Sequence, residues 1–277
     1  MFNGGYFRYI GHKHLVSWKM LAIVVVSALS MDSFLAELRR YCLQEGEQLS
    51  PWGMPLIWDK QYVSVIFLLI FLFAIADFPL DRSKEKYVIS RIGTTRWIWI
   101  QQMYLIVFSF LYEMLLFILQ FILLLPVTTW TMEWGSGWER LTNEQMRMKY
   151  TMILTIPKER IYNRDVIKTN VCYLLLLFLI LVFMAELVLW LNMYHKLVSA
   201  LLAAMLAIIP LSGKLSGRIF FFIPTTWMQQ KAQYSVYQTN QPTLEYMYLC
   251  VGLAIVLLIL FGMERCSRTQ ENNRRRY

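Results

Sequence analysis

The sequence predicts an all-α integral membrane protein with six transmembrane helices. Hydrophobic residues fill 57% of its 277 positions and charged residues only 16%, against roughly 45–50% and 25% in soluble domains. Charge-free runs of 16 to 19 residues recur along the chain, and a spanning helix needs about 20 mostly apolar residues. These runs cover residues 61–76, 97–112, 114–132, 169–185, 197–213 and 246–263. We therefore expect residues 1–277 to form a single transmembrane domain.

Residues 1–18 are predicted to be an interfacial leader. They mix aromatic and aliphatic residues with Arg8, Lys13 and two histidines, which is typical of a short amphipathic helix lying along a membrane surface. Three glycines leave a disordered basic leader as the alternative. The apolar run that follows resembles a signal peptide. However, more spans come after it, which favours an uncleaved first transmembrane helix at about 18–35, with Asp32 near its outer end.

A short charged segment separates the second and third predicted spans. Residues 36–60 are interpreted as an ordinary connection to span two, at about 62–80, whose exit is marked by Asp77 and Pro79. Span three, at about 97–125, is long enough to tilt or to project beyond the bilayer before Pro126 ends it.

Between these spans, residues 83–93 are predicted to form a short amphipathic helix. Asp81 or Ser83 can cap it, Glu85 lies favourably in the first turn, and Gly93 is a natural stop. One face is expected to gather Tyr87, Val88, Ile89 and Ile92, and another carries Lys84 and Arg91. The alternative is a solvated loop that only carries the positive charge that sets the topology.

The second half of the chain is predicted to hold three more spans. Residues 127–169 are expected to form a small folded extracellular loop, with Trp130, Trp134 and Trp138 as an aromatic belt. Span four covers about 171–193, span five about 197–215 and span six about 246–263, with a tight turn at 194–196. Residues 219–228 are too short and too broken by Pro224 to span, so a re-entrant or interfacial hairpin is expected.

Basic residues predict the orientation of the six spans. Placing both termini in the cytoplasm puts 14 Lys and Arg inside and 13 outside. The long loop 127–169 is mixed in charge, and long segments translocate with less regard to charge. Without it the count is 14 against 6, which favours cytoplasmic termini, a cytoplasmic tail at 264–277 and a cytoplasmic segment 83–93.

The sequence contains none of the short motifs of ATP hydrolysis, metal binding or acyl transfer. The P-loop pattern GxxxxGK[ST] is absent because Leu215 follows Gly213 and Lys214. HExxH, GxSxG and CxxC patterns are also absent. We therefore predict a non-catalytic chain without a metal or cofactor of its own, although a site assembled from distant spans stays open.

Two carboxylates fall within predicted spans. Glu113 lies near the middle of span three and Glu186 lies in span four, where a charge is costly unless it is paired or faces water. One interpretation puts them on a polar translocation path or at a subunit interface. The other is an interhelical hydrogen bond, with a protonated carboxyl group.

The chain resembles the permease subunits of bacterial ABC-2 type exporters. The resemblance rests on the order of six spans, the short helix between spans two and three, the string RIGTTRW at 91–97, and Pro224 and Trp227 before span six. It covers nearly the whole chain as architecture, and its local motif is basic-x-Gly-x-x-basic-aromatic. The leader resembles the interfacial elbow helix of that family.

The resemblance implies an exporter subunit of the bacterial cell membrane that moves an amphipathic or hydrophobic substrate such as a peptide. Residues 83–93 would dock on a separate ABC ATPase that binds ATP and Mg, through Lys84, Tyr87, Val88, Arg91, Ile92 and Gly93. His195 and Lys196 would make a second, smaller contact. A second permease copy, in a homodimer, would complete the path among membrane lipids. The alternative is a six-span membrane protein without pumping function, such as an immunity or sensor partner, or a secondary carrier.

Overall fold

The computed structural model describes residues 4–58, 60–79, 85–143, 145, 149, 166–194, 204, 205, 208, 252–254, 256, 257 and 260. The described chain is almost entirely helical, and its one extended pairing is an isolated bridge between Leu49 and Thr128. Its helices are α1 (Gly4–Leu15), α2 (Trp18–Glu45), α3 (Met54–Trp58), α4 (Gln61–Ile75), α5 (Glu85–Ile92), α6 (Thr94–Leu124), η2 (Leu125–Val127), α7 (Ser136–Arg140) and α10 (Val166–Tyr194). The predicted all-α class is confirmed for this part of the chain.

Three described helices are long and apolar enough to cross a membrane: α2, α6 and α10. They correspond to predicted spans one, three and four. Predicted span two is the shorter apolar helix α4, which ends at Ile75 instead of residue 80. The predicted spans five and six, the hairpin at 219–228 and the tail at 264–277 lie largely or wholly outside the described residues.

Helix α2 runs ten residues beyond the predicted end of span one. Its last turns bury Leu38, Tyr41 and Cys42 on one face, so packing continues after the apolar run has ended. Gly46 then stops the helix with a left-handed φ of 67°, and its N–H bonds to the Cys42 carbonyl. That conformation favours glycine. The interpretation of residues 36–60 as an ordinary connection is therefore wrong.

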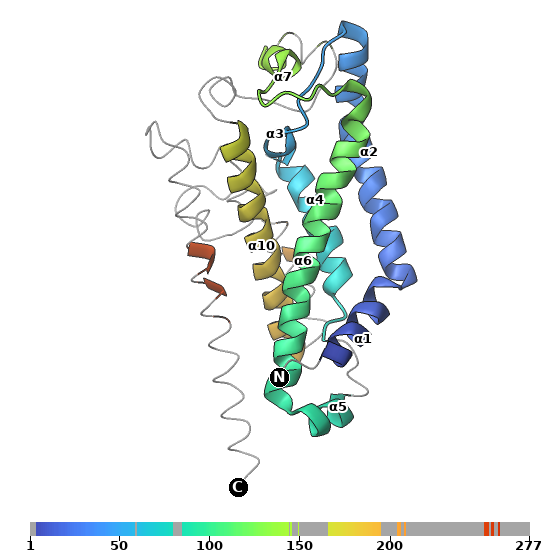
Figure 1. Ribbon diagram of the computed structural model, residues 1–277, viewed down its shortest axis with the longest axis vertical. Helices are drawn as coiled ribbons and strands as arrows, with labels where there is room; N and C mark the ends of the chain where they lie inside the picture. Colours follow the sequence, from blue (N-terminus) through green and yellow to red (C-terminus); the bar gives the residue numbers. More distant parts are fainter. Residues whose placement is uncertain are drawn as a thin grey trace.

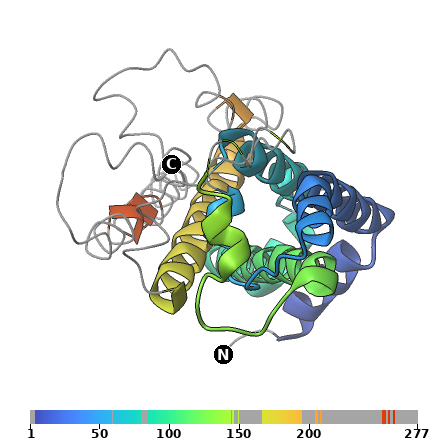
Figure 2. The same cartoon turned by 90° about the horizontal axis from the view of Figure 1, so that it is seen from above.

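The long helices form one bundle (Figures 1 and 2). Helix α10 packs against α6 and α4, and α2 packs against the same two helices. Aromatic side chains fill the interior, where the rings of Phe71 and Phe108 stack with centroids 6.0 Å apart. The Tyr112 hydroxyl donates to the Phe67 carbonyl at 2.9 Å, so its polar end is satisfied inside the bundle.

A small folded cap, made of α3, η2, α7 and the segments beside them, closes one end of the bundle (Figure 1). Its centre is the fully buried Trp138, whose indole N–H donates to the Ser50 carbonyl at 3.1 Å. Trp134 is also buried, whereas Trp130 is 74% exposed. The aromatic-belt prediction is therefore wrong for Trp134 and Trp138, because these two rings form the core of the cap.

Candidate functional site: α5 and the junction at its base

Helix α5 lies at the end of the bundle opposite the cap (Figure 1). A single residue, Gly93, joins it to α6, with a φ of 80° that non-glycine residues rarely adopt. The Gly93 N–H bonds to the Ile89 carbonyl at 2.8 Å, and the Gly93 carbonyl accepts from the Trp97 N–H at 3.1 Å. Of the helix predicted at 83–93, the part at 85–92 and the stop at Gly93 are confirmed, and residues 83 and 84 lie outside the described residues. Gly93 alone separates α5 from α6.

The two faces of α5 differ in exposure. Val88, Ile89 and Ile92 are half-buried, and Ile92 packs against the hydrophobic core. Tyr87 is 59% exposed. The Arg91 guanidinium carbon lies 4.4 Å from the centre of the Tyr87 ring, within the range of a cation–π contact.

The prediction that Tyr87 lies with the apolar residues is therefore wrong. Residues four apart share one side of a helix, and Tyr87 pairs with Arg91 on the outward side of α5. Gly93 is exposed beside this pair. Lys84, His195 and Lys196 lie outside the described residues.

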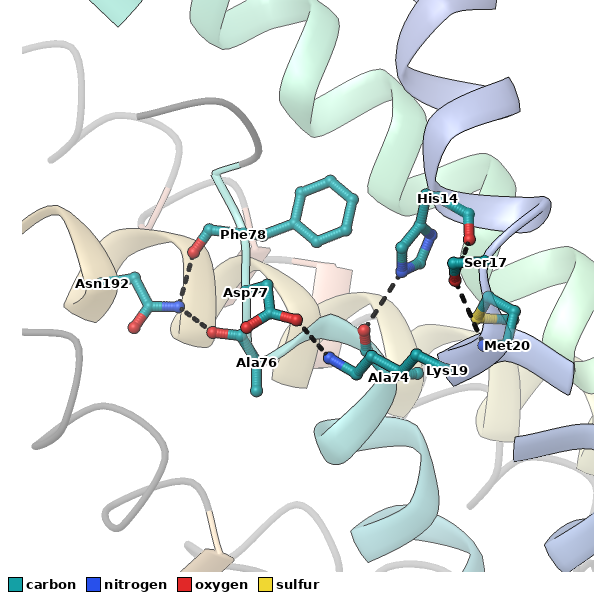
Figure 3. A network of polar contacts seen from close by, with 9 residues as sticks. All are labelled: His14, Ser17, Lys19, Met20, Ala74, Ala76, Asp77, Phe78 and Asn192. Atoms are coloured by element: carbon teal, nitrogen blue, oxygen red, sulfur yellow. Dashed lines mark hydrogen bonds and ion pairs between the residues drawn. The ribbon is translucent and has the colours of Figure 1, made fainter. Parts of the chain in front are cut away.

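Five residues from four parts of the chain form a network that we call the junction: His14, Lys19, Asp77, Phe78 and Asn192 (Figure 3). His14 is buried and joins α1 to two other helices. Its Nε2 lies 3.1 Å from the Ala74 carbonyl at the end of α4, and its Nδ1 lies 2.9 Å from the Tyr104 hydroxyl in α6. A carbonyl only accepts, so Nε2 carries the proton and Nδ1 is free to accept from Tyr104.

Burial keeps the His14 ring neutral. Desolvation lowers its pKa below the ordinary value of 6.5, and the positive charge of Lys19 acts in the same direction. The bond to Ala74 and the charge of Asp77 act against this but do not reverse it. The neighbouring His12 is exposed, so the two histidines do not converge on one ligand. The described residues also contain no group of three or more His, Cys, Asp or Glu that would hold a metal ion.

The elbow between α1 and α2, residues 15–17, is fixed by Ser17. Its hydroxyl donates to the His14 carbonyl at 2.7 Å and accepts from the Met20 N–H at 3.2 Å, which caps the start of α2. Lys19, in the first turn of α2, forms an ion pair of 2.5 Å with Asp77 beyond the end of α4. The elbow is thus attached to the chain segment that leads into α5.

Helix α10 holds the same segment from the other side (Figure 3). The Asn192 side-chain amide donates to the carbonyls of Ala76 at 3.1 Å and Phe78 at 2.6 Å. An amide nitrogen has two hydrogens, so both are used. Residues 76–78 are therefore held by α2 through Lys19 and by α10 through Asn192, and α5 is the next helix in the described chain.

A row of polar side chains follows the buried face of α6. Gln102, Ser109, Glu113 and Gln120 are all buried and lie seven or four residues apart, so they share one side of the helix. Gln102 donates to Glu186 of α10 at 3.3 Å. Glu186 therefore takes part in an interhelical hydrogen bond. Glu113 is eleven residues from Gln102, or about 16 Å along α6, so the two predicted carboxylates do not form a pair.

The junction is what the sequence patterns missed. Its contacts join His14 to residues 60 and 90 positions away, and Asn192 to residues more than 110 positions away. No short spacing encodes such contacts. The sequence offered one indication of the junction: His14 precedes the first predicted span, and Asn192 lies near the end of the fourth.

Comparison with protein-family models, curated proteins and solved structures finds no match for this chain. Function is therefore inferred from α5, the junction and the polar row of α6.

Proposed function

We propose that this chain is the permease subunit of an ATP-driven exporter of the ABC-2 type, and that α5 is where a separate ATPase docks. The observation that carries the proposal is the outward pair Tyr87 and Arg91 on a short helix joined by one residue to the 31-residue helix α6. Aromatic and arginine side chains are enriched at the energetic centres of protein interfaces. A partner that binds this pair would be linked to α6 through α5 and Gly93.

Energy has to come from such a partner, because the sequence contains no GxxxxGK[ST] phosphate-binding loop. ATP and Mg would bind to the ATPase. The basic residues favour a cytoplasmic α5 and cytoplasmic termini, which is the side of a bacterial plasma membrane where ATP is present.

Movement of α5 would reach the bundle by two routes. Its C-terminal end continues through Gly93 into α6, where the Gly93 carbonyl already bonds to the Trp97 N–H. Its N-terminal side follows residues 76–78, which Lys19 and Asn192 attach to α2 and α10. The one-residue connection at Gly93 favours movement of α5 together with α6 over local bending of α5.

The polar row on α6 supports a translocation path or subunit interface inside the bundle. Glu113 and Gln120 each bury a side-chain oxygen that has no hydrogen-bond partner among the described residues, and buried polar atoms without partners are costly. Water, a substrate group or a second copy of the chain would supply partners. A homodimer that exports an amphipathic or hydrophobic substrate such as a peptide fits these requirements.

The test is a double substitution, Tyr87→Ala with Arg91→Ala, in the full chain co-expressed with its partner ATPase. We expect normal membrane insertion, because both side chains point away from the bundle, and loss of ATP-dependent transport. The matched control is Trp130→Ala with Arg40→Ala, which removes an exposed aromatic residue and an exposed arginine outside α5 and the junction. Unchanged coupling in the α5 variant, or equal loss in the control, would reject the assignment of α5.

A further inference from the structure

An apolar groove of about 510 Å³ opens beside the elbow. Leu15, Val16 and Leu21 line one side, and Leu111 and Leu115 of α6 line the other. Two lining residues carry hydroxyl groups, Ser17 and Tyr112, and both already form hydrogen bonds within the protein. The groove therefore suits a hydrocarbon chain better than a polar ligand.

The elbow also has the features of a membrane-surface segment. Helix α1 buries Ile10 and exposes Arg8, His12 and Lys13, and a helix with one buried apolar position and exposed basic residues is typical of a membrane interface. Trp18 begins α2 with 86% of its surface exposed, and tryptophan is enriched at the level of lipid headgroups.

The lengths of the helices agree with an elbow at this level. Helix α6 has 31 residues, or about 46 Å, whereas the hydrocarbon core is about 30 Å thick. Part of α6 must therefore extend beyond the core. The groove reaches Leu111 and Leu115, near the middle of α6, so a hydrocarbon chain in it would run from the elbow toward the middle of the bundle.

The charged residues that precede the groove in the chain are basic. The first 31 residues contain Arg8, Lys13 and Lys19 and no acidic residue. Lys19 forms an ion pair with Asp77, Lys13 lies 6.0 Å from the centre of the Tyr9 ring, and both Arg8 and Lys13 are exposed on α1. We propose that the groove binds an acyl chain of an anionic phospholipid whose headgroup lies against Arg8 and Lys13.

The first test measures lipid retention by native mass spectrometry. Detergent-purified full-length chain is titrated with dioleoylphosphatidylglycerol or dioleoylphosphatidylcholine. We expect one retained phosphatidylglycerol and a weaker response to phosphatidylcholine. Arg8→Gln and Lys13→Gln should each reduce the preference about fivefold, since a basic residue near an anionic surface contributes about 1 kcal/mol. The control Arg40→Gln, near the other end of α2, should leave it unchanged. Equal retention of both lipids, or equal effects of all three substitutions, would overturn the proposal.

The second test fills the groove. Leu21→Trp should abolish retention of phosphatidylglycerol, whereas Leu43→Trp, at an exposed position near the other end of α2, should not. Full retention in the Leu21→Trp variant would overturn the proposal. The proposal would also be overturned if Leu21→Trp changed the oligomeric state of the chain but not the retention of phosphatidylglycerol. In that case a second copy of the chain, and not a lipid, would occupy the groove. Neither test contains an ATPase or a transport step, so the outcome is independent of the proposed exporter function.

Discussion

His14 in α1 and Tyr104 in α6, ninety residues apart in the chain, share a hydrogen bond of 2.9 Å. The second nitrogen of the same ring bonds to the carbonyl of Ala74 at the end of α4. Three helices are therefore joined through one neutral imidazole. One of these three helices, α4, precedes the proposed ATPase-docking helix α5 in the chain, and another, α6, follows it.

Lowering the pH should weaken the attachment of α1. The pKa of His14 in the folded protein lies below its unfolded value of about 6.5, so the unfolded state binds more protons between these two values. The stabilisation is therefore complete above about pH 6.5 and is lost as the pH falls toward the folded pKa. Lys19 and Asp77 face the ring with opposite charges, and Tyr104 faces it from α6.

Thermal unfolding of the detergent-purified protein between pH 7.5 and pH 5 would measure this loss. The slope of melting temperature against pH contains a part due to His14. This part should disappear in a His14→Gln variant, because glutamine does not titrate. His12→Gln is the matched control at an exposed position and should keep the slope. Identical slopes for wild type and His14→Gln would contradict the assignment.

Replacing Asn192 should loosen the segment that leads into α5. Asn192→Leu removes both donors and leaves the carbonyl of the buried Phe78 without its partner, which costs about 1–3 kcal/mol. We expect faster hydrogen exchange around residues 76–79 and in α5. Gln44→Leu, at an exposed site in α2, is the control. If exchange in α5 stays at the wild-type rate, Asn192 does not control that segment.

Adding one methyl group at Gly53 should disrupt the cap. A Cβ atom there would lie 2.1 Å from the Trp138 ring, and forcing extra volume into a packed core costs about 1–3 kcal/mol. Gly53→Ala should therefore lower the melting temperature and change the fluorescence of the buried tryptophans. Gly5→Ala, where a Cβ meets nothing within 4 Å, should not. Equal melting temperatures for the two variants would show that the cap tolerates the added volume.

The parts of the fold that the sequence predicted depend on local physics. Long apolar runs gave α2, α6 and α10, and Gly93 gave the boundary between α5 and α6, because length, hydrophobicity and a left-handed glycine act within a few residues. The end of α2 was missed, since its last turns are stabilised by burial of Tyr41 and Cys42 and not by an apolar run.

The candidate site was predicted only in part. Arg91 was predicted on a different face from the apolar residues and is exposed, but Tyr87 was assigned to the apolar face. Its stacking with Arg91 allows it to remain 59% exposed. Trp138 was misassigned because a tryptophan suits both a membrane interface and a packed core. Its ring lies against Gly53, which places it in the core of the cap.

A photo-crosslinking amino acid at position 87 would test the proposed contact between α5 and an ATPase. The same amino acid at position 130, which is also exposed but lies between η2 and α7 in the cap, is the control. If α5 docks on an ATPase, we expect a covalent adduct at position 87 with a protein that contains a P-loop, and none with that protein at position 130. Absence of such an adduct at position 87 in intact cells, or equal yields at both positions, would contradict it.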